Sequence, residues 1–219
     1  AGFTAETTRT KNEQITGLNY PSDNVRNLSS ALTIDKATTT GLNFKTGLLS
    51  YLGRLNYSFK DKYVLSMSMR ADGSSYFGQG NKWGYFPAGS VGWKLHNEGF
   101  LKNVDWLSKL LLRGGYGVSG NNRIADFLFV DTFVSTSYPL GAGTGSPSPG
   151  VSPNPTVQSN SDITWESTYQ TNLGLDLSLL KNRVNLNIDV YQSKTDKLLL
   201  YQPTMAFTGV THSITNIGS

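Results

Sequence analysis

The sequence predicts an all-β fold whose strands form part of the wall of an antiparallel transmembrane β-barrel. Three observations favour it: apolar and polar residues alternate with a period of two, the alternating segments are long, and aromatic residues gather where those segments end. Only 37% of the 219 residues are hydrophobic, which is low for a compact core. The chain contains no cysteine, and this excludes a disulfide framework and thiol chemistry.

The first clear strands lie at residues 49–59 and 63–70, joined by the short turn Lys60-Asp61, and a third lies at 90–96. In the first of them Leu49, Tyr51, Leu55, Tyr57 and Phe59 fall on one face. Serine, asparagine and arginine occupy most of the opposite face, as expected for a strand between two different environments.

The second half of the chain repeats this pattern in residues 169–179 and 183–190, around the tight connection Lys181-Asn182. Leucines at every second position alternate with Asn, Gly, Asp and Ser, which predicts a hairpin with one apolar and one polar face. We expect about seven strands in total.

Alternation alone leaves two environments open, because a soluble β-sandwich and a membrane barrel both produce it. Strands of roughly ten residues exceed the usual five or six, and this favours the membrane. Short turns at one end with long loops at the other favour it too. Aromatic residues at strand ends, such as Tyr57, Phe59 and Tyr63 around one short turn and Trp83 beside a long loop, are typical of interfacial girdles.

The connections complete this layout. Long outward loops are expected at residues 7–43, 72–84, 120–165 and 200–215, the third of them rich in Gly, Ser and Pro. Residues 98–109 place apolar side chains at helical spacing and predict a short helix at the end with the short turns.

The charge distribution and the N-terminal residues further limit the classes of protein that fit this sequence. The net charge of +4 is spread along the chain and forms no basic face for nucleic acid. No apolar run approaches the ~20 residues of a membrane-spanning helix, and no signal peptide opens the chain. We therefore expect a chain that begins within a longer protein, with any targeting segment upstream.

A series of motifs, taken in order and spacing, resembles the C-terminal barrel of SusC/RagA-like TonB-dependent transporters of Bacteroidetes. The resemblance spans roughly residues 45–219. The motifs are RLNYSFKDKY at 54–63, ADGSS at 71–75, KWGYFP at 82–87, SVGW at 90–93, LRGGYGVSGNN at 112–122, NLGLD at 172–176, KNR at 181–183 and DVYQSKTD at 189–196.

The resemblance implies a barrel of about 22 antiparallel strands, plugged by an N-terminal domain. It implies import of a large nutrient, an oligosaccharide or a peptide, driven by TonB, with a SusD-like surface lipoprotein over the outer mouth. Residues 1–219 would be a partial barrel in the outer membrane, without the plug and the remaining strands. The short turns would face the periplasm and the long loops the outside.

Candidate contact residues follow from this arrangement. Aromatic rings in outward loops can stack on sugar faces, although interfacial anchoring is the simpler role for them. These candidates are Tyr76, Phe77, Trp83 and Trp165. Arginines on the polar face are expected to face the lumen, where they contact plug or solute or pair with carboxylates: Arg54, Arg70 and Arg113.

Catalytic chemistry is not indicated. His96 and His212 are far apart in sequence, and neither glycine-rich segment has the Lys-Ser/Thr that a phosphate loop needs. We expect no enzyme activity, cofactor or metal. A soluble carbohydrate-binding or adhesion sandwich stays as the alternative, and it predicts that Leu173, Leu175, Leu177 and Leu179 are buried against a second sheet. A complete small barrel with a structural or adhesive role is a third hypothesis.

Overall fold

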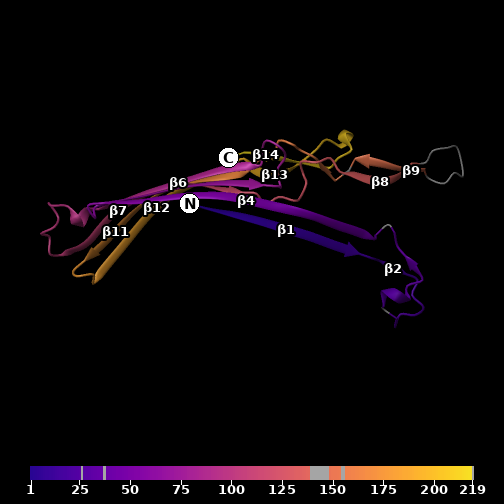
Figure 1. Ribbon diagram of the computed structural model, residues 1–219, viewed down its shortest axis with the longest axis horizontal. Helices are drawn as coiled ribbons and strands as arrows, with labels where there is room; N and C mark the ends of the chain where they lie inside the picture. The colour runs from indigo at the N-terminus through magenta and orange to yellow at the C-terminus, as the bar shows by residue number, and fades with distance from the viewer. Residues whose placement is uncertain (26, 37, 139–147, 154–155, 219) are drawn as a thin grey trace. The chain divides into compact units, whose positions relative to one another are not determined.

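The structure, a computed structural model, describes residues 1–25, 27–36, 38–138, 148–153 and 156–218 (Figure 1). Strands account for most of these residues, and the helical segments among them are short 3-10 turns at Leu28–Ser30 (η1), Leu95–Asn97 (η2) and Ala206–Thr208 (η3). No helix in the described ranges is long and apolar enough to span a membrane. The all-β prediction is confirmed.

Seven strands form the main sheet of the described chain, in the order β1-β4-β5-β6-β7-β11-β12. From β4 onward each neighbouring pair is antiparallel. The strands are β1 Gly2–Gln14, β4 Thr40–Phe59, β5 Tyr63–Ser74, β6 Trp83–Lys94, β7 Leu107–Asn121, β11 Glu166–Leu179 and β12 Val184–Asp196. At 12 to 20 residues they exceed the roughly 9–11 residues that a tilted strand needs to cross a bilayer.

The chain divides into two compact units, residues 6–47 and residues 1–5 with 48–219. In the first, β2 (Gly17–Leu18) pairs with β3 (Thr33–Ile34), and Arg9 Nε donates to Asn43 Oδ1 at 3.2 Å. The expected loop at 7–43 was wrong at both ends, since β1 continues to Gln14 and β4 begins at Thr40. Threonine-rich polar segments make strand hydrogen bonds through their backbone, so the apolar alternation that reveals a strand is absent from them.

The short turns have the backbone that a tight hairpin needs. Lys60 and Asp61 have φ of 51° and 52°, and Leu180, Lys181 and Asn182 have φ of 52°, 54° and 64°. Positive φ at successive residues matches the right-handed twist of the flanking strands. Backbone bonds tie these connections together: Lys94 N donates to Lys62 O at 2.7 Å, and Leu180 N donates to Trp106 O at 2.8 Å. We call the end of the sheet that carries these turns the short-turn end.

The helix expected at 98–109 was wrong. Residues 98–106 form consecutive turns, with Lys102 N donating to Glu98 O and Val104 N to Leu101 O, at 3.0 and 3.1 Å. A helix this short has the full free-energy cost of nucleation, and few further hydrogen bonds form to offset that cost. Leu107 and Lys109 pair instead with Leu179 and Ser178 of β11.

The opposite end of the sheet, which we call the long-loop end, contains more strands than expected. The predicted loops at 120–165 and 200–215 contain the hairpin β8–β9 (Phe133–Tyr138, Ser148–Pro153) and the sheet β10-β14-β13. The last three strands are Val157–Gln158, His212–Ile217 and Leu198–Pro203, and residues 139–147 of the Gly/Ser/Pro-rich loop lie outside the described ranges. The loop expected at 72–84 is shorter, because β5 runs to Ser74 and β6 starts at Trp83.

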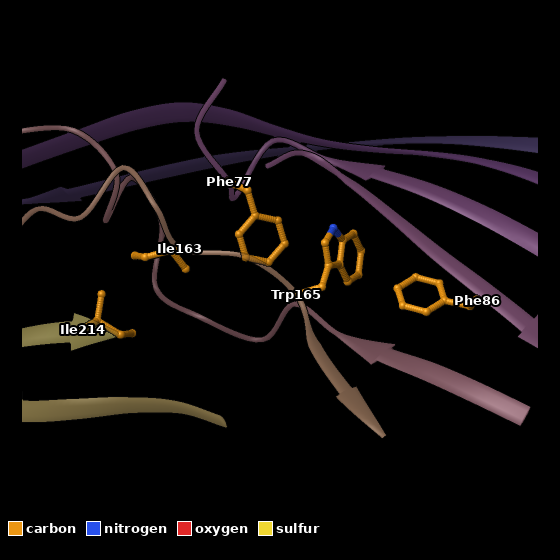
Figure 2. Packing of buried hydrophobic residues seen from close by; sticks show 5 residues of the cluster. All are labelled: Phe77, Phe86, Ile163, Trp165 and Ile214. Atoms are coloured by element: carbon orange, nitrogen blue, oxygen red, sulfur yellow. The ribbon is translucent and has the colours of Figure 1, made fainter. Parts of the chain in front are cut away.

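A small hydrophobic core lies at the long-loop end, and Figure 2 shows the Trp165 ring between Phe77 and Phe86. The ring centroids of Phe77 and Phe86 are 5.2 and 5.3 Å from that of Trp165, and Ile163 and Ile214 complete the cluster. Trp165 Nε1 donates to Lys82 O at 3.0 Å, so its one polar atom is satisfied. The cluster therefore joins the start of β11 to the β5–β6 connection and to β14.

Candidate functional site: two faces of one sheet

Strand register assigns each side chain of the main sheet to one of two faces, because directly paired residues share a face. Leu55 pairs with Met67 and Met67 with Gly89; Leu173 pairs with Gly114 and Val190. We call this the apolar face. It includes Tyr51, Leu55, Tyr57, Phe59, Tyr63, Met67, Trp83, Val91, Trp93, Leu112, Tyr116, Leu173, Leu175, Leu177, Leu186, Ile188 and Val190.

The apolar face is uncovered by other parts of the described chain. Leu173 is 61% exposed and Val190 66%. The sandwich alternative is contradicted, because it required Leu173 to be buried against a second sheet. A continuous apolar surface of this kind on long strands fits a hydrocarbon environment and is unfavourable in water.

The opposite face, which we call the polar face, carries all three candidate arginines. Arg70 Nε donates to Asp72 Oδ1 at 2.7 Å and Oδ2 at 2.8 Å, and its second terminal nitrogen donates to Ser50 Oγ at 3.2 Å. Arg54 Nε donates to Asn56 Oδ1 at 3.3 Å. Ser50, Asp72 and Arg70 belong to adjacent strands, so this contact links β4 to β5 on the polar face.

Arg113 is the centre of the larger polar network. It donates to Asp176 Oδ1 at 2.9 and 3.1 Å from two nitrogens and to Asp189 Oδ1 at 3.0 Å. Lys109 Nζ lies 3.5 Å from Asp176 Oδ2. The network spans β7, β11 and β12, and the absence of a side chain at Gly174 makes room for it, since a Cβ there would lie 2.6 Å from Asp189 Oδ1. Solvent screens these partly exposed ion pairs, so their main contribution is a charged, wet surface.

The four candidate aromatic residues separate into three environments. Phe77 and Trp165 are 0% and 5% exposed, and a buried ring offers no face to a solute, so stacking on a ligand is not carried forward for them. Trp83 lies on the apolar face, stacked on Tyr51 with centroids 6.0 Å apart, which fits interfacial anchoring. Tyr76 is half-buried and lines a cavity of about 410 Å³ at the long-loop end with Asn122, Arg123, Leu199 and Tyr201.

A polar cluster at the short-turn end was not predicted from the sequence. Glu98 accepts hydrogen bonds from Lys62 Nζ at 2.7 Å, Tyr63 Oη at 3.0 Å and Trp93 Nε1 at 3.1 Å. The Lys62 bond, followed by the Trp93 bond, holds the pKa of Glu98 below its usual range. Next to it, Lys94 and Asn97 donate to Asp61, and the bond from Lys94 lowers the pKa of that carboxyl. Partners 35 residues apart carry no local sequence signal, so only the fold brings them together.

His96 contacts the backbone of β7. His96 Nδ1 lies 3.1 Å from Leu110 O and 3.3 Å from Leu110 N. In the ranges that the structure describes, no three His, Asp or Glu residues gather as a metal site would require.

Comparison with known proteins gives one consistent family. Residues 2–219 match the family model described as TonB dependent receptor-like, beta-barrel. TonB-dependent receptor P39 of Formosa agariphila is 39% identical over 182 residues, which are 83% of this chain and 17% of that protein. TonB-dependent receptor SusC of Bacteroides thetaiotaomicron is 39% identical over 168 residues, 69% of this chain and 15% of that protein.

The fold comparison agrees. The structure of the RagAB peptide importer in its closed-closed state matches with a TM-score of 0.78 and 25% identity, over 99% of this chain and 23% of that chain. This chain thus spans less than a quarter of the length of the proteins it matches here. It belongs to the TonB-dependent receptor β-barrel family, among the SusC/RagA-like proteins of the outer membrane.

Proposed function

We propose that this chain forms part of the barrel wall and the outer loops of an active transporter that imports a large nutrient, an oligosaccharide or a peptide, with energy delivered by TonB. The observation that carries the proposal is the continuous polar face, with its arginine–aspartate network, on the opposite side of the sheet from an uncovered apolar face. One surface meets lipid and the other lines a wet lumen through which a polar solute passes.

In this arrangement the short-turn end faces the periplasm and the long-loop end faces outward. Arg54, Arg70 and Arg113 line the lumen, where their donors contact the plug domain or the passing solute. Arg70 already donates to Asp72, and Arg113 donates to Asp176 and Asp189. Arg54 donates to Asn56. The wall therefore presents paired charges, which attract water and polar solutes without trapping an anion.

At the outward end, the cavity beside Tyr76 supplies a contact for the solute or for a SusD-like lipoprotein that closes the mouth. Tyr76 and Tyr201 offer ring surfaces there, and Asn122 and Arg123 offer donors. Rings beside hydrogen-bonding groups suit both sugar faces and peptide backbones. The relative described as a peptide importer supports the peptide, and SusC supports membership of the same transporter group.

The test is uptake by cells that carry the complete protein. A strain lacking it is complemented with wild type, Tyr76→Ala or Tyr85→Ala, and uptake of fluorescent oligosaccharide and peptide pools is measured with and without a protonophore. Tyr85 is the matched control, because it is an exposed tyrosine on the apolar face. We expect energy-dependent uptake of one pool, reduced about tenfold by Tyr76→Ala, the loss of roughly one aromatic contact, and unchanged by Tyr85→Ala. Uptake of both pools that is independent of the protein contradicts the proposal.

A further inference from the structure

The apolar face contains a groove of about 710 Å³ near the short-turn end. Leu65, Val91, Leu112 and Leu173 form its walls, and Gly114 lies between two of them. A Cβ at Gly114 would lie 3.4 Å from Leu173 Cδ2 and 3.6 Å from Val91 Cγ2. The missing side chain on β7 therefore leaves a hollow between β6 and β11, in the surface that faces hydrocarbon.

Aromatic rings form the end of the groove nearest the turns. Tyr63 and Trp93 are stacked with centroids 6.1 Å apart, and Tyr57 and Phe59 with centroids 6.4 Å apart. Tyr63 Oη and Trp93 Nε1 both donate to Glu98, which fixes two of the four rings. The groove is therefore preformed, and an occupant does not have to order these side chains.

One cation lies beside this aromatic end. Lys60 Nζ is 5.2 Å from the centroid of the Phe59 ring, and Phe59 lines the groove. The neighbouring cations are engaged elsewhere, since Lys62 binds Glu98 and Lys94 binds Asp61. Arg113 also lines the groove, and it is paired with Asp176 and Asp189. An apolar groove, then an aromatic girdle, then an ammonium group is the order in which a phospholipid presents its acyl chain, glycerol region and phosphate.

We propose that this groove is a binding site for one phospholipid of the membrane leaflet at the short-turn end, with an acyl chain along Gly114 and the phosphate at Lys60. The proposal rests on the outer-membrane location of the family and not on the transported solute. Its volume lies within the roughly 300–1,000 Å³ of sites that hold small molecules. Charge favours this occupant over a second copy of the chain, because a lipid phosphate complements the ammonium group at the groove end.

The experiment uses the complete protein, extracted from outer membranes, stripped of lipid in detergent and titrated with dioleoylphosphatidylglycerol. Native mass spectrometry gives the dissociation constant of the first bound lipid. Gly114→Leu fills the groove, and Gly53→Leu is its control, because Gly53 lies on the apolar face with open space around its Cβ position and outside the groove. Lys60→Gln is matched by Lys181→Gln, since both lysines lie in short turns at positive φ.

We expect Gly114→Leu to weaken the first binding step about tenfold, which corresponds to roughly two methylene groups no longer buried, with no change for Gly53→Leu. Lys60→Gln should weaken it about fivefold, as expected for one cation at a membrane surface, with no change for Lys181→Gln. Val91→Phe fills the groove from β6 and replaces Gly114→Leu should that variant fail to assemble.

Equal affinities for Gly114→Leu, Val91→Phe and Gly53→Leu overturn the groove as the lipid site. Equal losses in the two lysine variants overturn the placement of the phosphate. A dimer that disappears on filling the groove shows that a second copy is the occupant, and this also overturns the proposal. Each outcome is separate from solute uptake, so the transport function can fail or hold independently.

Discussion

At the scale of single residues, the position of a side chain relative to the two faces decides its role more than its type does. Trp83 and Trp165 both flank the loop region of the long-loop end. Trp83 is 43% exposed and stacks on Tyr51 on the apolar face, whereas Trp165 is enclosed by Phe77 and Phe86. The residue type is the same at both positions, and only the register and the packing distinguish an anchor from a core residue.

Replacing Trp165 with alanine should therefore cost about 3–5 kcal/mol of the unfolding free energy at the long-loop end, because it opens a cavity in a packed core. It also leaves Lys82 O without its donor. Trp83→Ala removes one stacked contact at an exposed site, and a cost of about 1 kcal/mol is expected. Hydrogen exchange of residues 160–166 and 212–217 in the complete protein measures both; similar protection in the two variants would contradict the assigned core.

Glu98 gives a prediction that depends on pH. Its pKa is lowered in the folded protein, so the carboxylate contributes stability above its ordinary pKa of 4.5, and this contribution is lost as the pH falls through the lowered value. We expect denaturant midpoints of wild type and Glu98→Gln to differ at pH 7 and to converge as the pH falls through the lowered pKa of Glu98. Asp105→Asn removes a nearby charge without these three hydrogen bonds and should follow wild type; a constant difference for Glu98→Gln over the whole pH range would contradict the role of the charge.

At the scale of the elements, the sequence was sufficient for the central strands and their faces. Alternation in 49–59, 63–70 and 169–179 predicted strands whose apolar residues the register then places on one face. The prediction failed where alternation is absent or misleading. Residues 7–14 are polar throughout yet lie in β1. Residues 98–109 have helical spacing, yet 98–106 form turns and 107–109 begin β7, which pairs with β11.

The candidate site could be predicted only in part, because many of its contacts join residues that are far apart in the sequence. Arg54 and Arg70 could be assigned to the polar face from alternation, and Arg113 was expected there too. Their partners could not, since Arg113 lies 63 residues from Asp176 and 76 from Asp189. The burial of Phe77 was equally hidden, because it depends on residues of β6, of β14 and of the segment just before β11.

The two faces of β11 can be tested directly with one charge. Leu173→Arg places an arginine on the apolar face, and such a change costs about 2–4 kcal/mol near the middle of a bilayer. Gln170→Arg is the control, because Gln170 pairs with Gly117 and Ser193 on the polar face. We expect a large drop in folded protein in outer-membrane fractions for Leu173→Arg only, measured by the shift in gel mobility on heating; equal drops would mean that both faces meet the same solvent.

At the scale of the whole molecule, the relatives are several times longer than the 219 residues of this chain. In the described sheet β1 and β12 are the edge strands, and exposed edges are sites of further pairing. We expect the native species in outer membranes to be several times heavier than 23.9 kDa, with peptides of a plug domain upstream. Intact mass and peptide mapping check this; a native species of about 23.9 kDa would favour a complete small barrel.

Spin-label accessibility along β11, in the complete protein in native outer membranes, tests most directly whether this sheet separates lipid from lumen. The chain contains no cysteine, so single cysteines at positions 170 to 177 report one site each once cysteines elsewhere in the protein are replaced. We expect a period of two: labels at Leu173, Leu175 and Leu177 collide with oxygen dissolved in lipid, and labels at Gln170 and Asn172 collide with a water-soluble nickel complex. Equal accessibility of both sets to the nickel complex would contradict a barrel wall between lipid and lumen.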